Sequence, residues 1–343
     1  MEEISTRKEQ ILKAVVIEYV ATAEPVGSQL LGERYPMGIG PATIRSEMAE
    51  MSERGLLEQP HTSAGRIPSD SGYRYYVERL AEPIESKIAD REVRTVVRSD
   101  MDLDDLLRET CAVLTKLTRY ASIATTVSNR SVTVRQVTLA GVTPTRVVMI
   151  VLLSTGEVDN IILEASSDLT LSDLYEISAA LSAHVANKTI KQIARTSAPE
   201  FASRKQPAVE MMTRAWRALR TACKERSLGK IVREGTTYLL AEPEFQRNIA
   251  ALTDLVRAIE DADTMHQVLD RTPGSRANVT IGKEHEPEPL KSVAIIASRF
   301  FVHNEEAGAI AVLGPTRMRY EQTIPIVEHA ARALSDAITK LVS

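Results

Sequence analysis

The stretch that most constrains the fold of this chain runs from Pro41 to Arg66. Proline suits the first turn of a helix, where a missing N–H costs nothing. Apolar Ile44, Met48 and Met51 then recur at the spacing of one buried helical face. A glycine ends this helix, a short strand follows, and a polar loop leads to the arginine. This order predicts the second half of a winged helix-turn-helix, which places one helix in the major groove of DNA and a hairpin beside it.

Two further helices are expected before this stretch. Residues 5–23 carry one apolar helical stripe, which Ser5 or Thr6 can cap. Ser28 is suited to cap a short helix, Gln29–Arg34. Three helices followed by a hairpin complete the predicted unit.

DNA contacts are expected from three places in this unit. Side chains near the start of the 41–53 helix can reach base edges, and small hydroxyl residues in the loop let the backbone approach phosphate. The start of the preceding helix can hold a further phosphate. The predicted contacts are Ser28, Gln29, Thr43, Arg45, Ser46, His61, Thr62, Ser63, Arg66 and Arg74. Nearby Tyr73, Tyr75 and Tyr76 are expected to pack rather than to stack on bases.

The charge of the chain does not favour strong DNA binding by a single copy. Residues 1–80 carry nine Lys and Arg against twelve Asp and Glu, and the whole chain has a net charge of −4. Affinity for DNA must therefore come from a local basic patch and from two copies acting together. A winged helix used only for protein contacts stays an alternative.

The rest of the chain alternates irregularly between predicted strands and helices, which indicates α+β domains. Strands are expected at 131–140, 146–153 and 158–164, with helices near 171–184 and 207–227. The last third predicts strands at 277–281, 292–301 and 307–313 and a closing helix at about 320–341.

One segment, residues 186–230, is strongly basic, with eleven Lys and Arg and three Asp and Glu. Its apolar residues are spaced three and four apart, which predicts a helix with one apolar stripe beside a face that carries Arg217 and Arg220. That face is either the solvated side of a packed helix or a docking surface for an acidic partner or DNA phosphate.

Catalysis, metal binding and membrane insertion find little support. His61 and Ser63 share a loop without an orienting acid, and the six histidines lack metal-ligand spacing. Cys111 and Cys223 stand apart, as in proteins of reducing compartments. The longest apolar run, Val147–Leu153, is too short to cross a bilayer. We therefore expect a cytoplasmic protein that is not an enzyme, with no cofactor, metal or membrane partner.

Four segments carry distinctive motifs: EPVGS at 24–28, GPATIRSEM at 40–48, EQPHTSAGRIPSDSGYRYYVERL at 58–80 and LGPTRMRY at 313–320. Together they resemble the HrcA family of bacterial heat-inducible transcription repressors. The sequence departs from the family pattern at Ser46, where Asn is usual, and at Gly40, where Ser is frequent.

The resemblance implies three domains: a winged helix-turn-helix, a GAF-like α/β domain, and an α+β dimerisation domain inserted into it. The implied boundaries are 1–82 for the DNA-binding domain, 83–102 for a linker, 103–165 and 236–343 for the GAF-like domain, and 166–235 for the insertion. Within the insertion, Met212, Trp216 and Leu219 are expected at the dimer interface.

The resemblance also implies a function. A homodimer would bind an inverted-repeat operator upstream of chaperone genes and block their transcription. The chaperonin would keep the repressor active until heat stress occupies it with unfolded protein. The alternative is a regulator whose GAF-like domain senses a small molecule.

Overall fold

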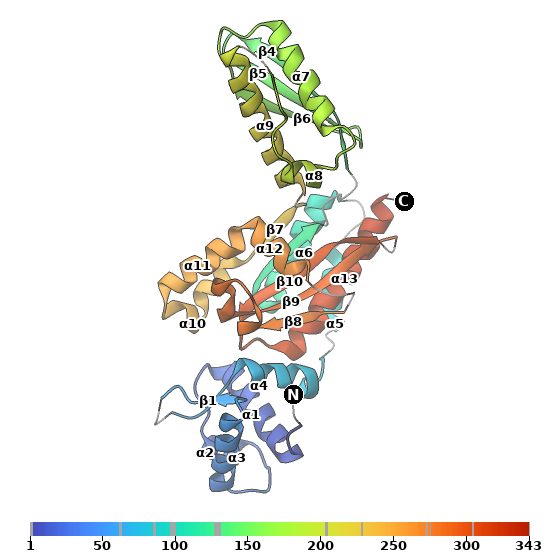
Figure 1. Cartoon of the computed structure of the whole chain (residues 1–343). Helices are drawn as coiled ribbons and strands as arrows, with labels where there is room; N and C mark the ends of the chain where they lie inside the picture. Colours follow the sequence, from blue (N-terminus) through green and yellow to red (C-terminus); the bar gives the residue numbers. More distant parts are fainter. Residues whose placement is uncertain are drawn as a thin grey trace. The chain divides into compact units, whose positions relative to one another are not determined.

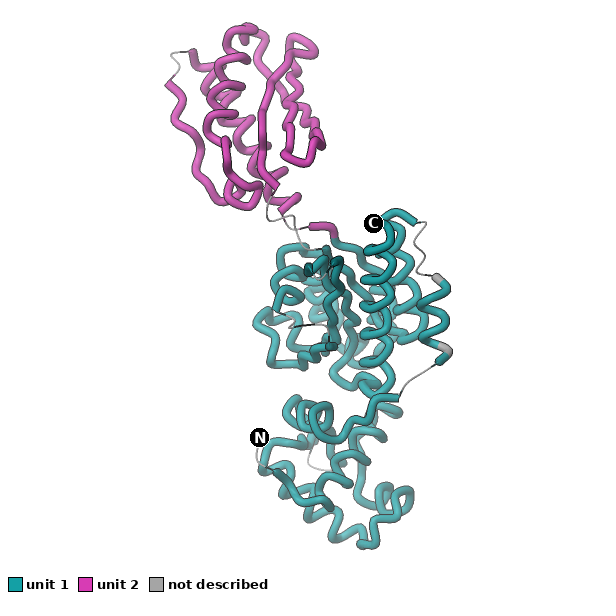
Figure 2. The backbone as a smooth tube through the Cα atoms, turned by 90° about the vertical axis from the view of Figure 1, so that its right-hand side faces the viewer, with its two compact units in different colours: residues 1–126, 231–343 teal, residues 127–230 magenta. Residues whose placement is uncertain are grey.

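The computed structural model describes residues 3–342, apart from 62–63, 85–86, 97–100, 127–131, 203–204, 228, 272–273, 275 and 304. Helices and antiparallel sheets alternate along the chain (Figure 1), so the predicted α+β class is confirmed. The chain divides into two compact units (Figure 2): unit 1 comprises residues 1–126 and 231–343, and unit 2 comprises residues 127–230. Within the described residues, no helix combines the length and apolarity needed to cross a membrane.

Unit 1 begins with three helices and a short antiparallel hairpin. We call these elements, together with the helix that follows them, the N-terminal module. The elements are α1 (Thr6–Thr22), α2 (Ser28–Arg34), α3 (Pro41–Glu53), β1 (Leu57–Glu58) and β2 (Ile67–Pro68). Ser5 caps α1 by accepting a hydrogen bond from the Lys8 N–H. Pro41 occupies the first position of α3, as predicted. Ser28 lies inside α2, which starts after Gly27.

The helix that closes the module is built on buried tyrosines. It consists of α4 (Asp70–Tyr75) and a π-helical turn, η1 (Tyr76–Leu80), and its start is capped by the Ser69 hydroxyl, which accepts from the Gly72 N–H at 3.0 Å. Tyr73, Tyr75 and Tyr76 are all buried, which confirms that they pack.

The remainder of unit 1 is a five-stranded antiparallel sheet with helices on both faces. The strands, in spatial order, are β7 (Ile231–Glu234), β3 (Ala121–Thr126), β10 (Glu305–Pro315), β9 (Val293–Val302) and β8 (Asn278–Ile281). One face packs against α5 (Lys87–Val96), α6 (Leu103–Thr118) and α13 (Tyr320–Val342). The other face is covered by η2 (Thr236–Ala241), α10 (Pro243–Gln246), α11 (Ile249–Glu260), α12 (Ala262–Leu269) and η4 (Glu288–Ser292).

Alternation along β9 explains the two cores. Ala294 and Ile296 face α6 and α13, whereas Ile295 and Ala297 face α11 and α12. Because successive strand side chains point to opposite faces, a strand buried on both sides is expected to be mostly apolar. The eight residues from Val293 to Phe300 are all buried, Ser298 and Arg299 included.

Unit 2 is a three-stranded antiparallel meander covered on one face by helices. Its elements are β4 (Val134–Thr143), β5 (Arg146–Leu153), β6 (Val158–Glu164), α7 (Leu171–Val185), α8 (Ile190–Arg195) and α9 (Gln206–Ser227). Alternate residues of β5, such as Met149 and Val151, pack against α7 and α9, and the residues between them are half-exposed. The sheet therefore has one covered face and one open face.

The boundaries of the inserted part differ from those predicted. We expected the three strands before residue 166 to belong to the sheet domain of unit 1 and the insertion to cover 166–235. In the structure β4, β5 and β6 pair only with one another among the described strands, and the second unit starts at residue 127 and ends at 230. Local alternation predicts strands, but it does not tell which sheet they join, because pairing partners are set by distant contacts.

Candidate nucleic-acid interface

The outward face of α3 presents three of the predicted contact residues. Thr43, Arg45 and Ser46 are exposed near the helix start, whereas Ile44 and Met48 point into the module with 0% and 3% of their surface accessible. Within the described residues Arg45 forms no ion pair. One cation and two hydroxyls on an open helix face suit contacts to base edges and phosphates.

Two of the three glutamates of α3 are paired with cations of α1. Lys8 Nζ lies 2.6 Å from Glu50 and 3.6 Å from Glu47, and Arg7 lies 3.6 Å from Glu47. The hydrogen bond from Lys8 lowers the pKa of the Glu50 carboxyl. These pairs offset the negative charge that α3 would otherwise present to phosphate.

A further glutamate of the module also serves an internal contact. Glu18 is buried in α1, where it accepts hydrogen bonds from Arg34 at 2.8 Å and from the Tyr35 hydroxyl at 3.0 Å. This carboxylate ties α2 to α1. The acidic excess counted in residues 1–80 is therefore partly structural.

The base of the β1–β2 hairpin is fixed to the helices. Val26 forms an antiparallel bridge with Arg66, with two backbone hydrogen bonds of 2.9 Å. The Arg66 side chain donates through Nε to the Ser52 hydroxyl of α3, also at 2.9 Å. Gly65 is required here, because a Cβ at this position would lie 2.3 Å from the Val26 carbonyl oxygen. Arg66 is thus anchored beside α3.

For the other predicted DNA contacts the structure gives fewer observations. His61 is exposed in the hairpin loop, and Thr62 and Ser63 lie outside the described residues. Ser28 and Gln29 stand in the first turn of α2, where the Gln29 amide donates to Glu33 at 3.2 Å. Their role at a phosphate stays a prediction.

The structure corrects the prediction for Arg74. Its guanidinium donates to both carboxylate oxygens of Glu284 and to the Val279 carbonyl at 2.6 Å, so it joins the module to the five-stranded sheet. The prediction placed Arg74 on the face of this helix that is turned to DNA. What covers that face is a segment about two hundred residues away in sequence, which spacing cannot reveal.

Sequence reasoning missed a second junction, built on Arg317 of the GPTRM motif. The guanidinium contacts the carboxylates of Glu242 and Glu244 and lies 3.4 Å from the Val20 carbonyl of α1. Nearly nine-tenths of the side chain is buried. The distinctive loop sequence was the available signal, and its role is to hold the module against the sheet.

Tyrosines complete this junction. The rings of Tyr73 and Tyr320 are 6.0 Å apart and tilted, and the Tyr76 hydroxyl donates to Glu321 at 2.7 Å. Burial raises the pKa of Tyr73 and of Tyr320 well above the usual value, so both phenols stay neutral.

The structure also corrects the predicted dimer residues. Met212, Trp216 and Leu219 are at most 4% exposed, because the stripe of α9 faces the core of unit 2 itself. The Trp216 ring meets His184 edge-on, with centroids 5.1 Å apart. A three-four spacing indicates a buried helix face, but it does not distinguish burial inside a domain from burial between copies.

Reactive centres are scarce in the part of the chain that the structure describes. No cluster of His, Cys, Asp or Glu side chains there is arranged to hold a metal ion. Burial raises the pKa of both Cys111 and Cys223 to about 12, which keeps these thiols protonated and unreactive.

A family profile described as "HrcA protein C terminal domain" matches residues 104–324. The chain belongs to the HrcA family. This match covers more than half of the chain and confirms the resemblance that four sequence segments carried.

Relatives named heat-inducible transcription repressor HrcA match this chain nearly end to end. The HrcA of Carboxydothermus hydrogenoformans is 34% identical, and that of Moorella thermoacetica 30%, each over 98% of both chains. The HrcA of Desulforudis audaxviator is 32% identical over 98% of this chain and 99% of its own. A crystal structure of a hypothetical protein covers 98% of this chain and 99% of its own with a TM-score of 0.61 and 21% identity, so the two share a fold.

Proposed function

We propose that residues 1–82 form a winged helix-turn-helix that reads double-stranded DNA, with α3 as the recognition helix and the β1–β2 hairpin as the wing. The observation that carries this proposal is the exposed edge of Thr43, Arg45 and Ser46 at the start of α3. The anchoring of Arg66 to the same helix supports it, because a recognition helix and a wing act together when their relative position is fixed.

In this proposal the protein acts in the cytoplasm and represses heat-inducible transcription, the role for which its relatives are named. Two copies bind an inverted-repeat operator and block the promoter of chaperone genes. Chaperonin keeps the repressor active, and heat stress withdraws that help. Two-fold symmetry of the protein then matches two-fold symmetry of the operator.

The five-stranded sheet of unit 1, with helices on both faces, is the proposed GAF-like domain. Arg317 and Arg74 hold the winged helix against it. A rigid attachment of this kind lets the sheet domain set the angle at which α3 meets DNA.

The proposed dimer surface is the open face of the sheet in unit 2. Ala140, Val148 and Ile162 stand side by side across the three strands of that face, and Ile162 is 70% exposed. Ala140 and Val148 are half-buried, and a partly exposed apolar row on a sheet face supports a protein partner. A second copy is the occupant we favour, because the open faces of two identical sheets are self-complementary about a two-fold axis.

The decisive experiment compares Arg45→Ala with Arg217→Ala on purified full-length protein. Arg217 is also an exposed arginine, on the basic face of unit 2, so its replacement is the control and also tests whether that face contacts DNA phosphate. We expect R45A to lose about 1–3 kcal/mol of binding free energy per half-site, the range of a specific base contact. R217A should bind a footprinted operator like the parent chain, as measured by fluorescence anisotropy.

Two outcomes would contradict parts of this proposal. Equal operator binding by R45A and the parent would indicate a winged helix that contacts protein rather than DNA. A salt dependence equivalent to ten or more phosphate contacts per subunit would contradict binding by a few contacts and two copies. A regulator that senses a small molecule is the second candidate, and a cavity in the sheet domain favours it.

A further inference from the structure

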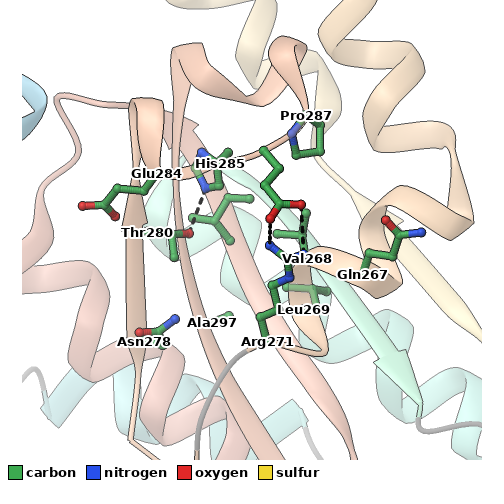
Figure 3. A pocket seen from close by; sticks show the side chains of 12 residues that line it. Gln267, Val268, Leu269, Arg271, Asn278, Thr280, Glu284, His285, Pro287 and Ala297 are labelled. Carbon is green, nitrogen blue, oxygen red and sulfur yellow. Dashed lines mark hydrogen bonds and ion pairs between the residues drawn. The ribbon is translucent and has the colours of Figure 1, made fainter.

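A cavity of about 120 Å³ lies in unit 1, on the face of the sheet that α12 covers (Figure 3). Asn278 and Thr280 of β8 stand opposite Ala297 and Ile295 of β9, so the four side chains share this face. The end of α12 lines the other side with Gln267, Val268 and Leu269. A cavity of this size holds a molecule of about one six-membered ring.

The floor of the cavity is apolar and its wall carries neutral polar groups. Leu269, Ile295 and Ala297 are each at most 3% exposed. Within the described residues, the side-chain amides of Gln267 and Asn278 make no hydrogen bond. Each amide offers donors and an acceptor, which a ligand with both kinds of group can satisfy.

Both ring nitrogens of His285 have hydrogen-bond partners in the wall of the cavity. Its Nδ1 lies 3.1 Å from the Gly282 carbonyl, and its Nε2 lies 2.8 Å from the Thr280 hydroxyl. Because a carbonyl oxygen only accepts, Nδ1–H donates to it, and in the neutral ring Nε2 accepts from the Thr280 hydroxyl. Burial lowers the pKa of His285, which agrees with this arrangement.

The charged residues around the cavity are already matched. Arg271 and Glu286 form a bidentate ion pair at the mouth of the cavity, with nitrogen–oxygen distances of 2.8 and 2.9 Å. Glu284 is paired with Arg74 of α4. Among the described residues that line the cavity, each Arg and Glu side chain therefore has a partner of opposite charge. The chemistry of the wall therefore favours an uncharged ligand with ring nitrogens or carbonyls.

The segment that lines this cavity also contacts the N-terminal module. This segment, Asn278–His285, contains β8 and the turn η3 (Gly282–Glu284). Gly282 lies so close to Asp70 that a Cβ would stand 2.2 Å from its carboxylate, and the Lys283 N–H donates to the same carboxylate at 2.9 Å. Both contacts reach α4, and Arg74 adds the contacts to Glu284 and to the Val279 carbonyl. The same eight residues, 278–285, therefore contact both the cavity and α4.

We propose that this cavity is an effector site for a small uncharged nitrogen heterocycle of pyrimidine size, whose binding changes operator affinity through residues 278–285. The regulatory half of this inference rests on the proposed DNA-binding function. Coupling between two sites is reciprocal, so operator DNA must change the affinity for the heterocycle by the same factor.

The test uses full-length protein with uracil as the probe and benzoate, an anionic ring of similar size, as the chemical control. Calorimetric titration should show saturable binding of uracil and none of benzoate. Asn278→Leu and Gln267→Leu should each abolish binding. Gln206→Leu, an exposed glutamine of unit 2, should leave it unchanged. Gln267 is exposed on α12, so its replacement tests the site even where N278L fails to fold.

The regulatory half is measured separately, by operator binding with and without uracil. We expect a change of about 5-fold or more in the parent chain. In Arg74→Ala uracil should still bind, but its effect on operator affinity should disappear. Absence of uracil binding, equal binding of benzoate, or full binding by Q267L would each overturn the proposed site. Should the parent chain fail to bind operator, the proposed function fails, while the titrations still decide whether the cavity binds the heterocycle.

Discussion

At the scale of single residues, Gly65 determines where the wing sits. Replacement by alanine places a Cβ 2.3 Å from the Val26 carbonyl oxygen, so the bridge to Arg66 must open. We predict that Gly65→Ala costs about 1–3 kcal/mol of stability, as overpacking does, and weakens operator binding. Gly27→Ala is the control, since no atom lies within 4 Å of an added Cβ there. Equal operator affinity of the two variants would contradict this role.

Individual residues differ in how far their roles could be predicted. Pro41 and Ser69 were predictable because helix starts depend on local chemistry. The contacts of Arg74 and Arg317 were not, since their partners lie far along the chain and only the folded sheet brings them near. Spacing tells which side of a helix is outward, but not which other segment packs there.

At the scale of elements, α7 begins with a carboxylate whose ionisation stabilises unit 2. Asp173 accepts hydrogen bonds from Thr170 and from Lys205 Nζ at 2.8 Å, and these contacts lower its pKa to about 2. A lowered folded-state pKa gives stability that is complete above about pH 4, the pKa of an unfolded aspartate. That stability is lost as the pH falls toward 2.

We therefore predict that Asp173→Asn removes part of the acid sensitivity of unit 2. Trp216 is the single tryptophan of the chain and is buried in this unit, so its fluorescence reports unfolding there selectively. In urea titrations between about pH 4 and 2 the midpoint of the parent chain should fall more steeply than that of D173N. Parallel curves would show that this carboxylate is not a source of the pH dependence.

The open face of the unit 2 sheet gives a second prediction for an element. Ile162→Asp places a charge in the apolar row of the proposed dimer surface and should convert the protein to monomers in sedimentation experiments. Leu171→Asp is the control, because Leu171 is 81% exposed at the start of α7, on the helical side of the sheet. A dimer that survives I162D but not L171D would place the interface on the helices instead.

The two corrected expectations about this unit have a common cause. The stripe that contains Trp216 and the strands from 131 to 164 were both recognised as elements from their periodicity. Whether a stripe faces its own core or a partner, and which sheet a strand joins, depends on contacts between distant segments. Periodicity carries no information about those contacts.

At the scale of the whole molecule, unit 2 is an insertion between two neighbouring strands. Thr125 of β3 pairs with Ile231 of β7 in antiparallel register, so the chain leaves unit 1 and returns to it at adjacent positions. Antiparallel neighbours of this kind are ordinarily joined by a hairpin of two or three residues. Unit 1 therefore has no structural need for residues 127–230.

We predict that replacing residues 127–230 by Asn-Gly leaves unit 1 folded. Between Thr125 and Ile231 the new loop is Thr126 followed by Asn and Gly, a three-residue hairpin with glycine at the position that needs positive φ. The shortened protein should be monomeric. It should bind a single half-site like the parent chain but lose about 100-fold or more of its affinity for the inverted repeat, because avidity is gone. A shortened protein that still bound the repeat as tightly as the parent would move the dimer contact from unit 2 into unit 1.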